Sequence, residues 1–443
     1  MSETHFPGVL RALDQAGIAH AVLRDQVGND PSDDLDLLIW PEDRSRFTEI
    51  VEGLGFRRSR HRVPKKAVYF AWREGQLQVL DVHYALVQGG LTYLPLPPRE
   101  SIVQDAPPRL APADELLHLI FHGLLGKGGI APKRLPRVRA LIGCGAGDRV
   151  VRRLTDPVIL GVVRAVIANP EQHGPGSARG QEASRRIRIR LLRRPANLWH
   201  RLRYLALRRF RPHRGLLVAF MGVDGAGKTT AIDRVTSLLE GTGRVRVVRT
   251  YLGPWGHFRT EVLRRAYSDW GFTPTTQDWL GRLGDRLRGR REAPSILRCL
   301  NKWARGRVRG CGYYAAVYYD LWKRYMTDVR PALSRGKVIL SDRYIYDLRY
   351  LHQNRPISTF PVSRRLLTRL FPRPHLIFLL RGDPARIAAR KAQLTPEQIG
   401  PLQATYRRAL SGLPVIEVNT NESVEVVADR ITGEIAGTYF SRR

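Results

Sequence analysis

The segment from Gly222 to Thr229 has the residue types and spacing needed to bind a nucleoside triphosphate. It reads GVDGAGKT and satisfies the pattern G-x-x-x-x-G-K-[ST]. Glycines let backbone N–H groups converge on a phosphate at a helix N-terminus, where the helix dipole favours negative charge. Lys228 can bridge the β- and γ-phosphates, and the Thr229 hydroxyl can hold Mg²⁺. The loop therefore predicts ATP and Mg²⁺ as cofactors, and the expected nucleotide-binding residues are Gly222, Asp224, Gly225, Gly227, Lys228, Thr229 and Thr230.

A second group of residues suited to chemistry is acidic and lies near the N-terminus. Asp34 and Asp36 stand at the start of DLDLLIW, which predicts a strand with both carboxylates on one face. Asp81, in LQVLDVHY, supplies a third carboxylate from a neighbouring strand. Three such groups can hold two Mg²⁺ ions for in-line nucleotidyl transfer. The alternative is an acidic strand start without a catalytic role.

Two histidines and three cysteines are weaker candidates for metal ligands. His118 and His122 stand four apart on a predicted helix, a spacing that could hold zinc. No acidic or cysteine partner is evident, so histidines that pack or cap a helix are the favoured interpretation. The cysteines, Cys144, Cys299 and Cys311, lack metal-ligand spacing and an even count, which indicates ordinary thiols in a reducing compartment.

The elements around the GVDGAGKT loop alternate between apolar strands and helices. Strands are predicted at GLLVAFMG, RVRVVRTYL, KVILSD, HLIFLL and LPVIEVNT, and TTAIDRVTSLLEG forms a helix after the loop. A long helical insert runs to about Ser334. Continuous apolar strands separated by helices predict an α/β fold with a parallel sheet covered on both faces. A glycine-rich turn that only happens to precede a helix is disfavoured by this context.

The N-terminal part predicts an α+β domain. Helices and strands alternate from Pro7 to about Val87, with VYFAWR and LQVLDVHY as a strand pair, and the pattern becomes helical from Ala111, starting at the capped helix PADELLHLIFHGLL. At 443 residues the chain is too long for one ordinary core. We therefore expect three parts: a domain at 1–176, a basic amphipathic connector at 177–214, and a P-loop domain at 215–443.

The connector differs from the sequence around it. RRIRIRLLRRPANLWHRLRYLALRRFRPHR places arginines among Ile, Leu, Trp, Tyr and Phe, and Pro195 divides it. One interpretation is a helix whose apolar side packs on a domain while its arginines are solvated. Residues 185–214 would also suit an anionic membrane surface or a nucleic-acid backbone.

The chain as a whole is strongly basic. The formal charge is +34, from 74 Lys and Arg against 40 Asp and Glu, which implies attraction to an acidic partner. The N-terminus lacks a signal pattern, and no segment has the apolar length needed to span a bilayer. We expect a cytoplasmic protein with the option of peripheral contact at the inner face of the membrane, and we do not expect specific nucleic-acid binding.

Three motifs together resemble the thymidylate kinase family, from about Gly215 to the C-terminus. They are the loop G-x-D-G-x-G-K-T-T, the strand end Ser341 to Tyr344 (SDRY), and HLIFLLRGDPARIAARKAQLTPEQIG, which looks like the family's Asp-Pro helix and mobile lid. The resemblance implies that Asp342 supports the magnesium shell and Arg343 contacts the acceptor phosphate. Arg386, Arg390 and Lys391 become lid candidates, and VIEVNTNESVEVVADRI resembles the strand and loop against which adenine rests.

The acceptor side departs from that family. The Arg-Glu-Pro-Gly-Gly segment after the second strand is missing, and YLGPWG stands at 251–256, followed by an insert rich in Arg and aromatic residues. This arrangement looks closer to thymidylate-kinase-like proteins found with bacterial polysaccharide and natural-product biosynthesis. The resemblance implies a small-molecule acceptor such as a metabolite, sugar or glycan precursor.

Residues 7–165 resemble the uncharacterised nucleotidyltransferase family of the polymerase-β type. The resemblance rests on HAVLRDQVGNDPSDDLDLLIW, VLDVHY and the helix ADELLHLIFHGLLGKG. A departure is that no Ser follows Gly28, where active members carry a Gly-Ser pair shortly before the two aspartates. Two interpretations of this domain stay open, an active transferase and a degenerate one.

The sequence therefore predicts an ATP-dependent kinase with a nucleotidyltransferase-like module. Lys228, Asp342, Arg343 and Arg390 are the expected catalytic residues, and Thr229, Asp342, Asp34, Asp36 and Asp81 the expected metal ligands. The alternatives are a dTMP-type nucleoside monophosphate kinase and, from another class, a nucleic-acid-binding ATPase.

Overall fold

A computed structural model describes residues 6–23, 34–59, 65–105, 107–210, 215–254, 315–349, 361–391 and 394–442. The chain divides into two compact units, Met1–Pro212 with Ala436–Arg443 (unit 1) and His213–Ile435 (unit 2). Most of the predicted insert after the YLGPWG segment, and Gly28, lie outside the described residues. Among the helices of the described chain, none has the length and apolar character to cross a bilayer.

Unit 2 contains a five-stranded sheet in which every pairing is parallel. Its order is β11 (Val247–Tyr251), β12 (Val338–Asp342), β10 (Leu216–Met221), β13 (Leu376–Arg381) and β14 (Val415–Asn419). All six residues of β10 are buried, as expected of a central strand. The predicted parallel sheet is confirmed, and the chain changes direction across the sheet at β10, where ligands of open α/β sheets bind.

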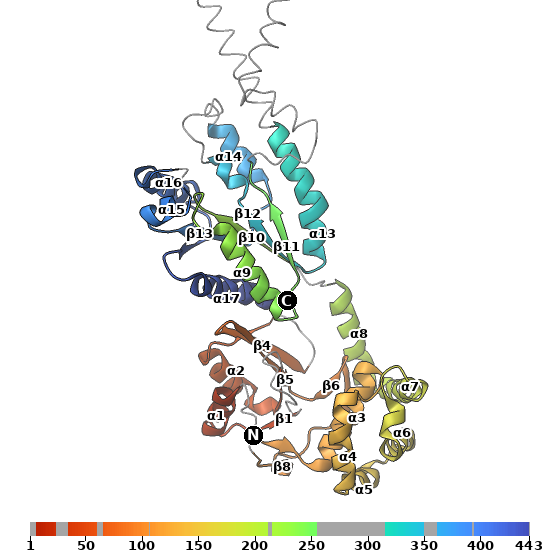
Figure 1. Cartoon of the computed structure of the whole chain (residues 1–443). Helices are drawn as coiled ribbons and strands as arrows, with labels where there is room; N and C mark the ends of the chain where they lie inside the picture. Colours follow the sequence, from red (N-terminus) through yellow and green to blue (C-terminus); the bar gives the residue numbers. More distant parts are fainter. Residues whose placement is uncertain are drawn as a thin grey trace, which may run out of the picture. The chain divides into compact units, whose positions relative to one another are not determined.

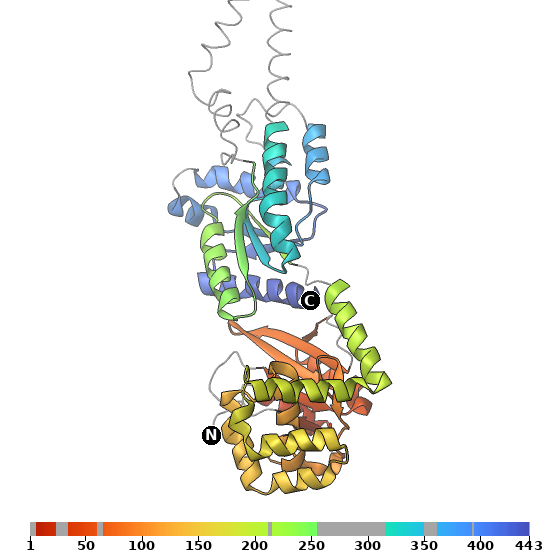
Figure 2. The same ribbon diagram turned by 90° about the vertical axis from the view of Figure 1, so that its right-hand side faces the viewer.

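Helices cover this sheet (Figures 1 and 2). They are α9 (Lys228–Gly241), α13 (Arg330–Ser334), α14 (Pro361–Leu370), α15 (Pro384–Arg390), α16 (Pro396–Ala409) and α17 (Val424–Arg442). Residues 315–324 are helical and lead through a π-helical turn, η6 (Tyr325–Val329), into α13. Figure 2 shows α9 and α13 on opposite faces of the sheet, so the sheet core is closed on both sides.

Unit 1 is built on a mixed sheet. Its order is β3 (Arg57–Arg58), β4 (Lys66–Arg73), β5 (Gln76–His83), β2 (Leu35–Ile39), β1 (His20–Val22), β9 (Arg109–Leu110) and β8 (Ile102–Val103). The predicted pair β4 and β5 is antiparallel, whereas β2 and β5 run parallel. A separate hairpin joins β6 (Leu86–Gln88) to β7 (Leu91–Leu94).

Two hydrophobic clusters hold unit 1 together. One packs α1 (Pro7–Gln15) and α2 (Arg44–Gly53) on the sheet through residues such as Leu13 and Phe47. The other joins the helical half: α3 (Pro112–Lys127), α4 (Leu135–Gly143), α5 (Ala146–Arg153), α6 (Pro157–Ala168) and α7 (Ala178–Leu192). The predicted capped helix α3 has no side-chain N-cap at Ala111, but it starts at a proline and ends at Gly128, whose left-handed backbone caps its C-terminus.

The predicted connector forms two helices with different environments. In α7, Ile187 and Leu191 are fully buried within the helical cluster, so this segment is part of the core of unit 1. Pro195 starts the second helix, α8 (Pro195–Phe210), because proline is tolerated in the first turn of a helix. The two halves of one basic sequence therefore differ in how much apolar surface they bury.

Candidate functional site

The candidate phosphate-binding loop, Gly222 to Thr229, which we call the phosphate loop, joins the carboxyl end of β10 to α9. Gly222, Gly225 and Gly227 have φ angles of 144°, 86° and 85°, which side-chain-bearing residues rarely adopt. A Cβ atom on Gly222 would lie 2.6 Å from the carbonyl oxygen of Leu380. Three glycines are therefore required by this backbone path, and the path brings the loop against the end of β13.

Lys228 is buried beneath this loop. Its side chain is 7% exposed, and Nζ donates to the carbonyl oxygens of Gly222 (3.0 Å) and Val223 (2.8 Å). The pKa of Lys228 is lowered to about 8, first by burial and then by the nearby Arg343 guanidinium, although the carboxylates of Asp224, Asp342 and Asp347 act in the opposite direction. A buried ammonium that donates to neutral carbonyl oxygens would donate more strongly to an anion such as a phosphate.

Asp342 ends β12, next to β10. It stands in register with Phe220 on one side and Tyr251 on the other. Its Oδ1 atom is buried and has no hydrogen-bond partner among the described residues, and its charge favours the protonated form of Lys228. A buried acceptor without a donor calls for a cation or ordered water, which fits the predicted magnesium role.

Arg343 is held by a network that links distant segments. Its guanidinium donates to Asp347 Oδ2 (2.9 Å) and to the Tyr406 hydroxyl (3.0 Å), and forms an ion pair with Asp224. Its φ is 62°, a left-handed conformation that is strained for a residue with a side chain. The backbone and the network thus direct the partly buried Arg343 guanidinium, 14% exposed, toward Asp224 in the phosphate loop.

The same network lowers the pKa of Asp224, the carboxylate in the phosphate loop. Burial raises the pKa of Asp224, but the charges of Arg343, Lys228 and Lys391 outweigh it and leave the pKa below its ordinary value. Sequence reasoning named Asp224 and Arg343 but missed Asp347 and Tyr406. The four-residue spacing from Arg343 to Asp347 was the available signal, whereas nothing local points to Tyr406.

The lid candidates contact the phosphate loop and the loop after β14. A Cβ atom on Gly227 would lie 3.8 Å from an Arg390 guanidinium nitrogen, and one on Gly225 would lie 3.3 Å from Lys391 Cβ. Arg390 and Lys391 therefore lie beside the phosphate loop. Arg386 donates to the carbonyl oxygen of Asn421 (3.1 Å) and Arg390 also donates to that of Thr420 (3.4 Å), so both residues tie α15 to the loop after β14.

Thr229 and Thr230 follow Lys228 in the first turn of α9. Both residues are exposed, at the helix end where backbone N–H groups lack intrahelical partners. This placement leaves the Thr229 hydroxyl accessible at the edge of the loop.

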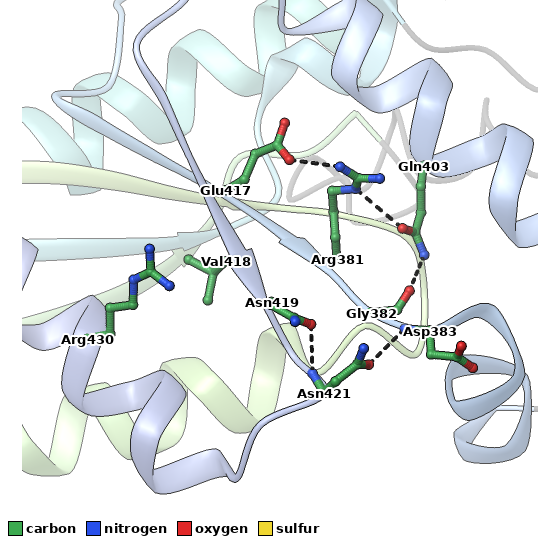
Figure 3. Close-up of a pocket in the computed structure, with 9 residues that line it drawn as sticks. All are labelled: Arg381, Gly382, Asp383, Gln403, Glu417, Val418, Asn419, Asn421 and Arg430. Carbon is green, nitrogen blue, oxygen red and sulfur yellow. Dashed lines mark hydrogen bonds and ion pairs between the residues drawn. The ribbon is translucent and has the colours of Figure 1, made fainter.

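A pocket of about 380 Å³ opens at the carboxyl ends of β13 and β14 (Figure 3). Its lining residues are Arg381, Gly382, Asp383, Gln403, Glu417, Val418, Asn419, Asn421 and Arg430. Gln403 donates to the carbonyl oxygen of Gly382 (2.9 Å), and Asn421 accepts from the backbone N–H of Asp383 (2.8 Å). The volume and amide groups suit a nucleobase, and the pocket includes the segment that resembles the adenine-binding strand and loop.

The described start of the YLGPWG segment, residues 251–254, lies beside Arg343. A Cβ atom on Gly253 would lie 2.9 Å from Arg343 Cβ and 2.7 Å from the Tyr251 ring. Arg324, only 5% exposed, donates to the carbonyl oxygen of Tyr251 (3.1 Å) and pairs with Asp320 (2.6 Å). A buried ion pair therefore positions the start of this segment next to the candidate acceptor arginine.

In unit 1 the parallel pairing of β2 and β5 places Asp36 opposite Asp81. Potential ligand atoms of Asp36, Asp81 and His83 lie within 4.8 Å of one another, and Asp36 and His83 are almost fully buried. Asp81 Oδ1 is buried and has no hydrogen-bond partner among the described residues, while Oδ2 is 2.5 Å from Lys66 Nζ. Two carboxylates and an imidazole fit one divalent cation.

Sequence reasoning predicted part of this group. Asp34 is half-buried one residue before β2 and does not belong to the close group. His83 was missed, although Asp81 and His83 stand two apart on one strand and so share a face. Lys66 was also missed, because its approach depends on the β4–β5 pairing.

His118 and His122 have polar neighbours other than each other. His118 Nδ1 is 2.9 Å from the Tyr93 hydroxyl, and His122 Nδ1 is 3.1 Å from an Arg134 guanidinium nitrogen. Both histidines are buried in the helical half of unit 1, as the packing interpretation expects. Within the described residues, neither belongs to a group of three ligands that could hold a metal.

Comparisons with known proteins point to a kinase over part of the chain. No protein-family model matches the chain. The thymidylate kinase of Xanthomonas oryzae pv. oryzae (strain PXO99A) is 30% identical over 184 residues, covering 40% of this chain and 62% of that protein. The thymidylate kinase of Xanthomonas campestris pv. campestris (strain B100) is 32% identical over the same shares.

A thymidylate kinase of Bifidobacterium longum subsp. infantis is 28% identical over 234 residues, covering 50% of this chain and 86% of that protein. The chain thus spans 62% of the length of the Xanthomonas relatives. Part of the chain is similar to thymidylate kinases, and the similarity supports a kinase-like region.

Proposed function

We propose that unit 2 is an ATP- and Mg²⁺-dependent kinase that transfers the γ-phosphoryl group to a small acceptor. The observation that carries this proposal is the loop from Gly222 to Thr229, whose left-handed glycines bury Lys228 at the start of α9. The similarity to thymidylate kinases supports it from the sequence side.

The residues present fit such a nucleotide. Backbone N–H groups of the loop and Lys228 would hold the phosphates, and the pocket in Figure 3 would take the base. The Thr229 hydroxyl and the unpartnered Asp342 oxygen would hold the metal. When bound, Mg²⁺ supplies positive charge that offsets the negative charge of the phosphates. Arg390 and Lys391 lie where they would add further positive charge.

The proposed acceptor carries a phosphate of its own. Arg343 is a partly buried cation at the phosphate loop, and Asp224, Asp347 and Tyr406 hold its guanidinium. Such an arrangement suits a second anionic group next to the transferred one. The relatives' name, thymidylate kinase, favours a nucleoside monophosphate. Phosphosugars and glycan precursors share this chemistry and are the alternative.

The test uses purified protein, Mg²⁺ and γ-labelled ATP with dTMP, other nucleoside monophosphates, phosphosugars and a cell extract. Lys228→Met should reduce transfer by on the order of 10²–10³-fold, because the cation on the phosphates is lost. The control is Lys323→Met, which changes an exposed lysine on the helix before the π-helical turn, outside the phosphate loop, and should keep full activity. Undiminished transfer by a folded Lys228→Met protein would refute the assignment.

A second candidate activity belongs to unit 1. The group of Asp36, Asp81 and His83 favours a divalent cation at a nucleotidyltransferase-like site, as the resemblance of residues 7–165 implies. The cation would polarise a triphosphate bound beside it. This activity is proposed for one cation, since Asp34 lies outside the close group and Lys66 neutralises one Asp81 oxygen.

The corresponding experiment measures Mn²⁺ and Mg²⁺ binding by calorimetry and the transfer of label from α-labelled nucleotides. Asp36→Asn should abolish cation binding, while Asp34→Asn should weaken it much less, because Asp34 lies outside the close group. Equal losses in the two variants would contradict the proposed ligand set.

A further inference from the structure

One side of helix α8 packs on the hairpin of β6 and β7 and is hydrogen-bonded to it. Asn197 is buried; its amide donates to the carbonyl oxygen of Thr92 (3.0 Å) and accepts from the Thr92 backbone N–H (3.0 Å). Arg201 donates to the carbonyl oxygen of Gly89 (2.6 Å), and a Cβ atom on Gly90 would lie 2.9 Å from Tyr204 Cβ. These contacts fix the rotation of the helix about its axis.

The opposite side of α8 is apolar. Leu198, Trp199, Leu202 and Leu205 are 47%, 65%, 53% and 43% exposed. They stand at positions i, i+1, i+4 and i+7, so they share one face, which we call the α8 face. A helix surface that meets only water is normally polar, and a contiguous exposed apolar face marks an interaction site.

Unpaired positive charge borders the α8 face. Arg193 and Arg194 precede α8 and Arg203 lies within it; all three are exposed and make no ion pair with any residue that the structure describes. On the preceding helix α7, by contrast, Arg185 and Arg186 pair with Glu182, and Arg190 pairs with Asp156. The sequence has no acidic residue between Glu182 and Asp224.

We propose that the α8 face docks on the surface of an anionic lipid bilayer, with the helix lying in the interface. Leucines and a tryptophan would enter the boundary between headgroups and acyl chains, and the arginines would meet the lipid phosphates. This proposal is independent of the kinase proposal, because it rests on unit 1 residues alone.

Charge and residue type favour a bilayer over two other occupants. The phosphates of a nucleic-acid backbone would pair with the arginines, but they offer no apolar surface for the three exposed leucines. Pairing with a second copy of this chain would bring two basic faces that lack acidic residues together, and their like charges would repel. A bilayer of anionic lipids satisfies both the apolar face and its basic border.

The test measures co-sedimentation of the full-length protein with vesicles of phosphatidylcholine alone and of phosphatidylcholine with phosphatidylglycerol. The double variant Trp199→Ser/Leu202→Ser should weaken partition into the mixed vesicles at least about tenfold, because each side chain contributes apolar burial. Because both residues are exposed, the fold and the phosphoryl-transfer activity should be unchanged. The matched control, Val424→Ser/Val426→Ser, changes two exposed apolar residues on α17 and should bind like the parent.

A triple variant, Arg193→Gln, Arg194→Gln and Arg203→Gln, should weaken binding to the mixed vesicles and remove the preference over phosphatidylcholine. Equal vesicle binding by the parent and the double variant would overturn the proposal. So would absence of vesicle binding together with salt-sensitive binding to DNA or RNA, or a dimer in sedimentation that the double variant abolishes.

Discussion

Burial beneath the phosphate loop makes Lys228 an unusual lysine. Its ammonium lies against two carbonyl oxygens and a carboxylate 3.6 Å away, and its pKa falls to about 8. Because this value lies below the ordinary pKa of about 10.4, the unfolded chain holds the proton over a range where the folded chain has lost it. This group alone therefore makes folding stability rise with pH from about 8 to 10.

The same shift predicts how nucleotide binding depends on pH. Between pH 7 and 9 Lys228 loses most of its positive charge, so ATP affinity should fall by up to roughly tenfold. Lys228→Arg should bind less tightly but with a flat profile, because its guanidinium stays charged. Calorimetric titration with Mg²⁺-ATP across this pH range is the measurement. An equally steep profile in Lys228→Arg would show that another group titrates.

At the level of elements, the end of β13 constrains the backbone of the phosphate loop, which follows β10. Gly222 leaves β10 with a φ of 144° directly against the end of β13, where a Cβ atom would meet Leu380. Gly241, at the end of α9, has ordinary helical backbone and no atom within 4 Å of a Cβ. The two glycines stand at the two ends of the same loop and helix, but only Gly222 is at a position that a side chain cannot occupy without strain.

The pair therefore makes an internally controlled stability experiment. Gly222→Ala should destabilise unit 2 by about 1–3 kcal/mol through backbone strain and the clash with Leu380. Gly241→Ala should be neutral or stabilise by up to about 1 kcal/mol, because alanine loses less conformational freedom in a helix. Urea unfolding of both variants measures the difference. Similar destabilisation in both would mean that the loop backbone is not constrained as described.

At the scale of the whole molecule, two units with separate cores each carry a candidate site made from their own residues. The phosphate loop, Asp342 and the pocket of Figure 3 come from unit 2, whereas the group of Asp36, Asp81 and His83 comes from unit 1. Residues that share no partners usually contribute additively.

Additivity predicts independent activities. Asp36→Asn with Asp81→Asn should leave phosphoryl transfer within about twofold of the parent, because both residues belong to the sheet of unit 1 and the phosphate loop belongs to unit 2. Lys228→Met should in turn leave Mn²⁺ binding by unit 1 unchanged. The check is to assay both activities in each variant. A matching loss of both activities would instead show that the two units form one site.

Local patterns in the chain determine much of unit 2. The spacing of Gly222, Lys228 and Thr229 identifies the loop because a phosphate cradle needs glycine conformations and a cation at set positions along one strand–helix turn. Apolar runs such as those of β10 and β12 predict buried parallel strands because both of their faces must be covered. The sequence by itself therefore determined the loop, its flanking elements and the class of the sheet.

Only the tertiary structure decided which distant residues meet. Asp224 and Arg343 are 119 positions apart, and Tyr406 lies 63 positions beyond Arg343. Asp36 and Asp81 face each other through the register of β2 and β5, which also brings His83 into the group and leaves Asp34 outside. Likewise, α7 and α8 have similar basic sequences, yet α7 is in the core while α8 exposes its leucines. The physical reason is that periodicity encodes which residues share a face, whereas the partner that covers the face is selected by the packing of the whole unit.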